Sequence, residues 1–395
     1  MLNTGTIYGI NGPVIYLKGN TGFRMSEMVY VGKQKLVGEV IALDKDRTTI
    51  QVYEETTGLR PGEEVVASGN AVSVTLAPGI LNNIFDGIER PLERIAETGG
   101  AFITRGVSVD SLDREKKWKT HIVVEKGQYL HGGDIIAEVP ETHAILHKCM
   151  IPPDVEGTVK EVVKDGEYTI DETLVILELP DGGEKKLTMT QRWPIRVPRP
   201  THHRFPASVP LVTGQRIIDT MFPIAKGGTA AIPGGFGTGK TMTQHQIAKW
   251  ADADIIIYIG CGERGNEMTQ VLEEFGELTD PRTGNPLMDR TTLIANTSNM
   301  PVAAREASIY TGLTLAEYYR DMGYDVAIMA DSTSRWAEAL RGTFGTFGRD
   351  AGRRRISGLS GIKIVGVLRE SRNDAQSERN RRIGYDHRSG IASGR

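Results

Sequence analysis

The residues of this chain best suited to chemistry lie between positions 234 and 241. They read G-G-F-G-T-G-K-T, which fits G-x-x-x-x-G-K-[ST], the pattern of a loop that cradles phosphate groups. Glycines let successive backbone N–H groups turn toward a phosphate, and the N-terminus of the following helix adds positive potential. The predicted phosphate-binding residues are Gly234, Gly235, Phe236, Gly237, Thr238, Gly239, Lys240 and Thr241.

Within this loop, Lys240 is expected to reach the β- and γ-phosphates, and Thr241 to offer its hydroxyl to Mg²⁺. The pattern requires a strand before the loop and a helix after it. Residues 229–232 read as a short buried strand and residues 242–250 as a helix, so the context favours a phosphate site. The alternative is a glycine-rich surface turn.

Charged residues follow two other apolar runs that we expect to be buried strands. Asp331 comes directly after 326–330, at the sheet edge where an acid can hold Mg²⁺, usually through water. It is also placed to cap a helix predicted over 335–340. Glu263 and Arg264 follow the run 255–259. There the carboxylate could polarise an attacking water and the guanidinium could brace the site; a surface turn is the alternative.

Composition sets the class of the protein. The chain has 395 residues, enough for two to four domains, with 39% apolar and 25% charged residues, as in ordinary globular proteins. No apolar run approaches the ~20 residues of a membrane span, and the N-terminus lacks the apolar core of a signal peptide. Cys149 and Cys261 form no disulfide or metal pattern, which fits a reducing compartment. We therefore expect a cytoplasmic protein, or one held at a membrane by partners.

The order of motifs predicts a multidomain α/β protein. Residues 1–70 hold short β-rich runs between turns, the pattern of a small β-barrel. Residues 71–110 should begin the nucleotide-binding domain, with a helix over 80–95, and 111–190 form a β-rich insert. Residues 191–341 alternate apolar strands with helices, as in a RecA-like P-loop core with a parallel sheet.

The insert resembles the hammerhead of biotinyl or lipoyl carrier domains. A carrier needs an exposed lysine at the tip of its hairpin, and the corresponding residues 140–144 read P-E-T-H-A. A structural β-insert is therefore the better interpretation.

Several blocks together resemble one family, the catalytic A subunit (alpha chain) of V-type/A-type rotary ATP synthases. The resemblance covers about 1–341 and includes the phosphate loop, G-E-R-G-N-E at 262–267, A-N-T-S-N-M-P at 295–301 and A-D-S-T-S-R-W at 330–336. It also includes N-G-P-V at 11–14, Q-V-Y-E-E-T at 51–56 and L-D-R-E-K-K-W at 112–118.

The resemblance implies roles for individual residues. It makes Lys240 a phosphate ligand, Thr241 a Mg²⁺ ligand and Asp331 the holder of the metal's water shell, while Glu263 activates the hydrolytic water. Arg264 would support the phosphate site, and Arg335 would belong to the residues that surround and support it. One departure is Gly235, where the family usually has proline. This glycine should raise the ordering cost of the loop by under ~1 kcal/mol.

The family also implies partners. ATP or ADP with Mg²⁺ would bind at interfaces of a hexamer that alternates this chain with a B subunit, which supplies an arginine in trans. Central and peripheral stalk subunits would connect the hexamer to a membrane sector that carries H⁺ or Na⁺, placing the chain on the cytoplasmic face of the cell membrane. No nucleic-acid partner is expected. The alternatives are a Rho-like RNA translocase, which the mixed charge of 1–70 disfavours, and a nucleotide-binding fragment without turnover.

Residues 342–395 differ from the rest of the chain. They carry twelve Lys and Arg against five Asp and Glu, in a chain with a net charge of −3. Back-translation of 342–354 with one base removed can give E-L-S-G-R-L-E-E-M-P-G-E, close to the family's continuation. We therefore expect a segment translated out of frame, disordered, and lacking the family's C-terminal domain. A basic nucleic-acid-binding tail is the alternative.

Overall fold

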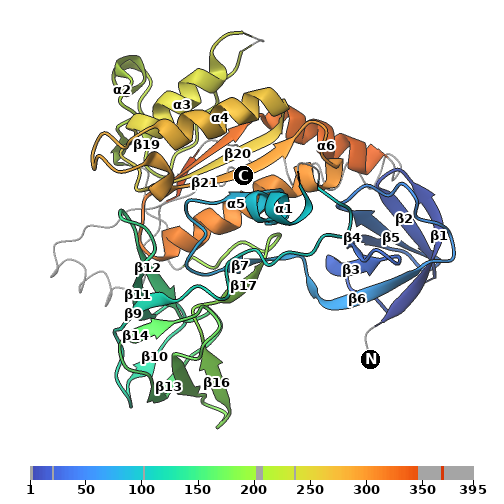
Figure 1. The fold of residues 1–395 in the computed structure, drawn as a ribbon, viewed down its shortest axis with the longest axis horizontal. Helices are drawn as coiled ribbons and strands as arrows, with labels where there is room; N and C mark the ends of the chain where they lie inside the picture. The colour runs from blue at the N-terminus through green and yellow to red at the C-terminus, as the bar shows by residue number, and fades with distance from the viewer. Residues whose placement is uncertain are drawn as a thin grey trace.

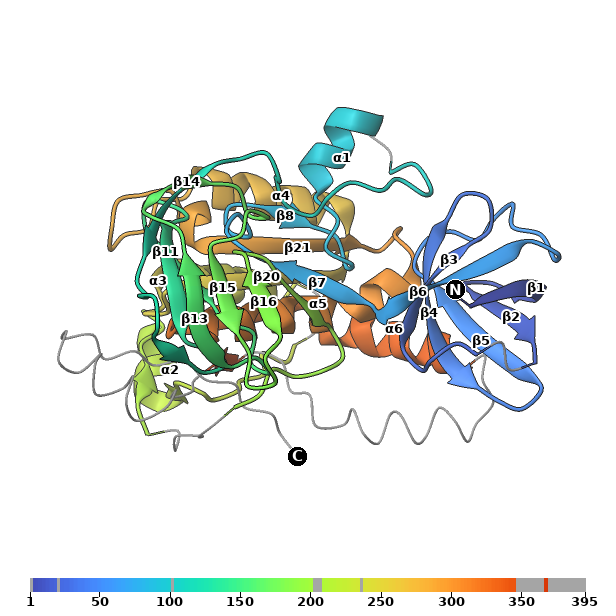
Figure 2. The same cartoon turned by 90° about the horizontal axis from the view of Figure 1, so that it is seen from below.

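The computed structural model describes residues 3–19, 22–100, 103–201, 208–234, 237–345 and 366–368, with 342–345 and 366–368 described by their backbone alone. A closed barrel, a β-rich module and an α/β unit with a mainly parallel sheet make up the molecule (Figure 1, Figure 2). This architecture confirms the predicted fold class. Within these ranges, no helix is long and apolar enough to cross a membrane.

Six antiparallel strands close the N-terminal barrel in the order β1-β2-β5-β4-β3-β6. Buried and exposed positions alternate, as in β3, where Val29 and Val31 are buried and Tyr30 is exposed. The first two strands form a hairpin, in which Gly12 has φ 57° and turns the chain. The strands are β1 (Thr4–Asn11), β2 (Val14–Lys18), β3 (Glu27–Val31), β4 (Leu36–Leu43), β5 (Arg47–Val52) and β6 (Glu64–Ala71).

The β-rich module consists of two four-stranded sheets, ordered β10-β13-β15-β16 and β12-β11-β9-β14. Its strands are β9 (Trp118–Ile122), β10 (Tyr129–Leu130), β11 (Ile135–Pro140), β12 (Leu146–Met150), β13 (Gly157–Val162), β14 (Gly166–Tyr168), β15 (Val175–Glu178) and β16 (Glu184–Leu187). The chain then returns through β17 (Gln191–Pro194), which pairs with β7 (Ser73–Leu76). This pairing places the segment that leaves the module beside the strand that follows the barrel.

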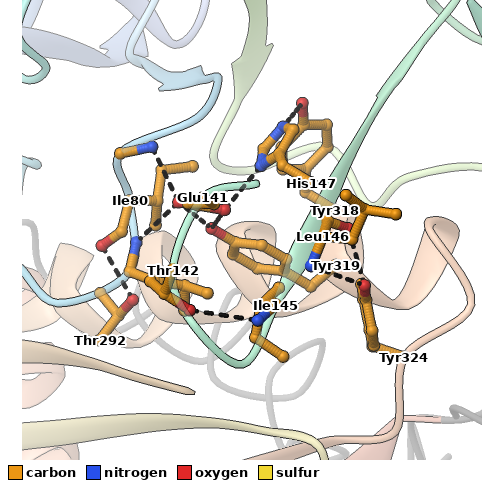
Figure 3. A network of polar contacts seen from close by, with 12 residues as sticks. Ile80, Glu141, Thr142, Ile145, Leu146, His147, Thr292, Tyr318, Tyr319 and Tyr324 are labelled. Atoms are coloured by element: carbon orange, nitrogen blue, oxygen red, sulfur yellow. Dashed lines mark hydrogen bonds and ion pairs between the residues drawn. The ribbon is translucent and has the colours of Figure 1, made fainter. Parts of the chain in front are cut away.

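The tip of the β11–β12 hairpin docks on the α/β unit (Figure 3). Glu141 is buried there and accepts a hydrogen bond from the Tyr319 hydroxyl at 3.0 Å. Its other oxygen lies 2.7 Å from His147 Nδ1, and His147 Nε2 lies 2.9 Å from the Tyr318 hydroxyl. The hairpin end that would carry the lysine of a carrier domain therefore forms an internal contact.

The central sheet of the α/β unit has the order β23-β22-β20-β21-β8, in which only β23 runs antiparallel to its neighbour. The predicted strands 255–259 and 326–330 are present. The strands are β8 (Ile84–Phe85), β20 (Ile255–Glu263), β21 (Thr291–Thr297), β22 (Val326–Asp331) and β23 (Gly366–Leu368). Because parallel strands end at the same edge, Glu263 and Asp331 are brought together there.

Helices cover both faces of this sheet (Figure 1). Ile257 and Ile259 pack with residues of α5 (Val302–Asp321) in one core cluster. Ile256 and Tyr258 face the other way, toward α3 (Lys240–Trp250) and α4 (Gly265–Glu277). The remaining elements are α1 (Leu92–Gly99), α2 (Arg216–Met221), α6 (Thr333–Gly345), the 3₁₀ helix η1 (Leu287–Arg290), β18 (Pro210–Leu211) and β19 (Ile224–Ala225).

The predicted helix over 80–95 is wrong. Strand β8 joins the sheet in that segment, and the helix α1 begins only at Leu92. The carboxylate of Asp86 accepts hydrogen bonds from the backbone N–H groups of Ile88 and Arg90, which fixes a turn in place of a helix. Gly87 lies so close to the Ala304 carbonyl oxygen that a Cβ atom would stand 1.9 Å from it.

Candidate functional site

The glycine loop turns the chain directly into α3. Gly237 and Gly239 both have φ 78°, a left-handed conformation that glycine adopts without strain, and Gly239 precedes the first helical residue, Lys240. The ammonium of Lys240 donates to the carbonyl oxygen of Gly234 at 2.8 Å. Predicted residues Gly235 and Phe236 lie outside the described residues. The loop and the N-terminus of an eleven-residue helix form a site suited to an anion.

Thr241 and Asp331 meet at the start of α3. The Thr241 hydroxyl donates to Asp331 Oδ2 at 2.6 Å, although the two residues are 90 positions apart in the chain. Asp331 ends β22 and is 4% exposed, and its carboxylate engages this hydroxyl. A hydroxyl beside a carboxylate is a donor pair that suits Mg²⁺.

Glu263 ends the neighbouring strand β20, where acidic groups surround it. Burial raises its pKa to about 7, with further contributions from a hydrogen bond to Glu267 and from the negative charge of Asp331. A carboxylate with a pKa near neutrality is suited to accept a proton at physiological pH. The sequence prediction for this residue therefore coincides with the most perturbed acid at this sheet edge.

The two arginines of the predicted site lie at its rim. Arg264 precedes α4, and its guanidinium stands 3.8 Å from the carboxylate of Glu267. Arg335 lies in the first turn of α6, where its guanidinium pairs with Glu338 at 3.2 Å. Both side chains are more than half exposed, so they lie at the border of the site that Lys240 and the acidic residues form.

Two buried polar residues at this edge were missed by the sequence analysis. Asn296, near the end of β21, has no hydrogen-bond partner among the described residues for either amide atom. Arg305 lies in the first turns of α5 and is 7% exposed. Small residues around it, Ala303, Ala304 and Ala307, were the available signal, because they bring the helix close to the sheet and bury a charge at that point.

The predicted strand over 229–232 is wrong. Thr229 forms a single bridge, and residues 230–234 have no regular pairing. The segment therefore enters the glycine loop in an irregular conformation.

A glycine loop leading into a helix, at the carboxyl edge of a parallel sheet, defines the class of P-loop nucleotide-binding proteins. Three family models match the chain: the ATP synthase alpha/beta family β-barrel domain over residues 7–69, the alpha/beta subunit barrel-sandwich domain over 109–196 and the nucleotide-binding domain over 214–359. The chain belongs to the ATP synthase alpha/beta family.

Curated relatives agree with this assignment. The chain is 63% identical over 338 residues to the V-type ATP synthase alpha chain 2 of Clostridium tetani and 59% identical over 337 residues to the V-type ATP synthase alpha chain of Halothermothrix orenii. The corresponding subunit of the A-type ATP synthase from Methanopyrus kandleri is 60% identical over 337 residues. Each match covers 85% of this chain and 57% of the relative, so the chain spans somewhat over half the length of these proteins.

A solved structure supports the fold alone. The ATPase EscN of the enteropathogenic E. coli type III secretion system matches with a TM-score of 0.55 at 21% identity, over 87% of this chain and 60% of that one. The nucleotide-binding family model extends past Arg341 into the basic segment. Apart from 342–345 in α6 and 366–368 in β23, that segment lies outside the described residues, and its origin in a shifted reading frame stays a prediction.

Proposed function

We propose that this chain is the catalytic, nucleotide-binding subunit of a V/A-type rotary ATPase, which makes or hydrolyses ATP coupled to H⁺ or Na⁺ transport. The proposal is supported by the similarity to V-type and A-type ATP synthase chains and by the position of Thr241 and Asp331 beside the phosphate loop. The observation that carries it is the 2.6 Å contact between these two residues, together with Glu263 on the adjacent strand.

Mg²⁺ fits the donor set of this site. The described residues contain no group of three or more His, Cys, Asp and Glu side chains that could hold a metal ion alone. Mg²⁺ commonly takes few protein ligands and completes its shell with water and substrate phosphates, so a hydroxyl and one carboxylate are sufficient. Thr241 would be a direct ligand and Asp331 would hold a bound water; the ion would neutralise charge on the phosphates.

Residues of the chain itself would bind the phosphates and activate the water. Lys240 and the backbone N–H groups of the loop would bind the phosphates, with Gly234 to Thr241 as the cradle. Glu263 would orient the attacking water and take its proton, because its pKa of about 7 lets it be ionised before the reaction and protonated after it. Arg264 and Arg335 would support the site from its rim.

The partners and the location are part of the same proposal. We infer a hexamer in which the chain alternates with a B subunit, whose arginine completes the site in trans, and stalk subunits that connect the hexamer to a membrane sector. The chain would then lie peripherally on the cytoplasmic face of the membrane. The relatives are longer than this chain, so assembly has to be tested with the 395-residue chain itself.

Calorimetric titration with Mg·ADP tests the first step. We expect saturable binding that is lost in Lys240→Ala and kept in Lys249→Ala, which removes a lysine from the last turn of the same helix. Equal binding by both variants would refute the loop assignment. Binding without hydrolysis, in the presence of the B subunit, would restrict the proposal to a nucleotide-binding function.

A further inference from the structure

Arg305 packs against the end of β20 that carries Glu263, where the pairing with β21 shifts register between Cys261 and Glu263. A Cβ atom added to Gly262 would stand 2.9 Å from Arg305 Cδ and 3.0 Å from Arg305 Nε, so the arginine side chain lies directly on this residue. Gly262 has φ 78° and precedes Glu263. The close approach of a buried arginine to a left-handed glycine indicates that a side chain of α5 holds the shape of this strand end.

A chain of hydrogen bonds connects Arg305 to the backbone of Glu263. The Arg305 guanidinium donates through Nη2 to the carbonyl oxygen of Ser298 at 2.8 Å. The backbone N–H of Ser298 in turn donates to the carbonyl oxygen of Glu263 at 2.8 Å. Hydrogen bonds from a charged donor are stronger than those between neutral groups, so Arg305 stabilises the position of Ser298 against Glu263.

In a second contact between the two elements, the donor lies on β20 and the acceptor on α5. The thiol of Cys261 donates to the carbonyl oxygen of Arg305 at 3.4 Å, so the strand end and the helix are joined on both sides of Gly262. The Nε atom of Arg305 is buried and has no hydrogen-bond partner among the described residues. A guanidinium that is nine-tenths buried with one unused donor is costly for stability alone, which favours a functional reason for its position.

The helix that bears Arg305 is itself held in place. Glu306, the next residue, is buried and accepts a hydrogen bond from Arg196 Nη1 at 3.0 Å, while Arg196 Nε pairs with Glu39 of the barrel at 2.7 Å. The indole of Trp336 in α6 donates to the Glu306 carbonyl oxygen at 3.0 Å. Contacts with the barrel and with α6 thus fix the start of α5, the part of the helix that carries Arg305.

We propose that Arg305 is a positioning residue that holds Gly262 and Glu263, at the irregular end of β20, in the geometry needed for water activation. The consequence for catalysis rests on the proposed function; the positional role does not. Arg305 acts through Ser298 and Gly262 and needs no contact with the nucleotide.

Residue-resolved hydrogen exchange measures this role directly. In Arg305→Gln, we expect exchange of the Ser298 amide to rise about tenfold, because its acceptor on Glu263 is no longer held. Arg305→Lys keeps the charge and one donor and should restore part of the protection. Arg320→Gln removes an equally buried guanidinium from the other end of α5 and should leave Ser298 unchanged.

Nucleotide assays separate this proposal from the proposed function. Single-turnover hydrolysis of Mg·ATP should fall about tenfold or more in Arg305→Gln, with the affinity for Mg·ADP within about twofold of wild type. Equal exchange at Ser298 in the Arg305→Gln and Arg320→Gln variants would overturn the positional role. If the wild-type chain fails to hydrolyse Mg·ATP, the proposed function fails, and the exchange result still decides the role of Arg305.

Discussion

Two carboxylates near opposite ends of α5 have opposite environments. Glu141 reaches the C-terminal end of the helix from the β-rich module and is surrounded by donors, namely Tyr319, His147 and the backbone N–H groups of Gly79 and Leu81 (Figure 3). Glu263 lies near the N-terminal end, where Glu267 and Asp331 are its neighbours. One carboxylate is fully provided with donors and the other is placed among acids.

The pKa values differ because burial is outweighed by donors at Glu141 and reinforced by neighbouring acids at Glu263. Complete burial acts to raise the pKa of Glu141, but the positive charge and hydrogen bond of His147 and two backbone N–H groups outweigh it and hold the pKa below its usual value. Glu263 is only half buried, yet its pKa rises to about 7. A carboxylate provided with donors stabilises a fold, whereas a carboxylate held among other acids is a candidate for a functional group.

The largest expected effect is on turnover. Glu263→Gln should reduce ATP hydrolysis about 10²- to 10⁴-fold, because the proposed general base is lost, and leave the affinity for Mg·ADP unchanged. Since the pKa of Glu263 is raised on folding, its ionisation destabilises the fold as the pH rises from about 4.5 to about 7. The variant should therefore unfold at a higher temperature than wild type at pH 8. Glu273→Gln, an exposed change on α4, is the control for both measurements.

The second effect is on stability. Glu141→Gln replaces a buried carboxylate, which contacts His147, Tyr319 and two backbone N–H groups, by a neutral amide. It should lower the free energy of unfolding by about 3–5 kcal/mol, because several hydrogen bonds to a charged group are weakened together, measured by denaturant unfolding at pH 7. The lowered pKa means that this stability is present above about pH 4.5 and is lost as the pH falls through the folded-state value. Glu138→Gln on the same hairpin should cost little. An unchanged denaturation midpoint in the Glu141→Gln variant would show that Glu141 does not stabilise the fold, and would contradict the difference proposed between Glu141 and Glu263.

A smaller effect should follow from one hydroxyl in the same network. Tyr319→Phe removes a donor that lies 3.0 and 3.1 Å from the two oxygens of Glu141 and should cost about 1.5–3 kcal/mol, the range for a hydrogen bond to a charged group. Tyr324→Phe is the matched control, because its hydroxyl donates to the neutral carbonyl oxygen of Leu146. We expect the control to cost about 0.5–1.5 kcal/mol by the same unfolding measurement. Equal losses would show that charge does not strengthen the hairpin contact.

The smallest effect concerns pH dependence. Glu267 raises the pKa of Glu263 through a hydrogen bond and through its charge, so Glu267→Gln should lower that pKa. The rising limb of kcat/KM against pH, which ionisation of Glu263 would set if it is the base, should then move to lower pH. A shift to higher pH would mean that Glu267 stabilises the ionised form.

Sequence reasoning predicted the parts of the candidate site that lie within short motifs. Lys240 and Thr241 follow from one loop, and Asp331 and Glu263 follow from their place after apolar strands, because parallel strands share a carboxyl edge. It could not place Arg305, since a charged residue within a helix pattern reads as solvent-facing unless the packing of the helix on the sheet is known.

Contacts between segments distant in the sequence account for the remaining differences between the sequence prediction and the structure. Glu141 meets Tyr319 across 178 positions of sequence, and nothing in the tip P-E-T-H-A indicates a buried acid. The segment 80–95 has a helical pattern, but Asp86 caps its own backbone and Gly87 must approach Ala304. In both places tertiary contacts decide a local structure that propensity alone leaves open.

The most direct test of the contrast is a carboxyl NMR titration of both residues in one sample of the 395-residue chain. With ¹³C-labelled glutamate and the Gln variants for assignment, the account predicts that Glu263 titrates at about pH 7 and that Glu141 stays ionised to below about pH 4.5. A Glu263 that titrates at its ordinary value, or a Glu141 that titrates above that value, would contradict the division between a functional and a structural carboxylate.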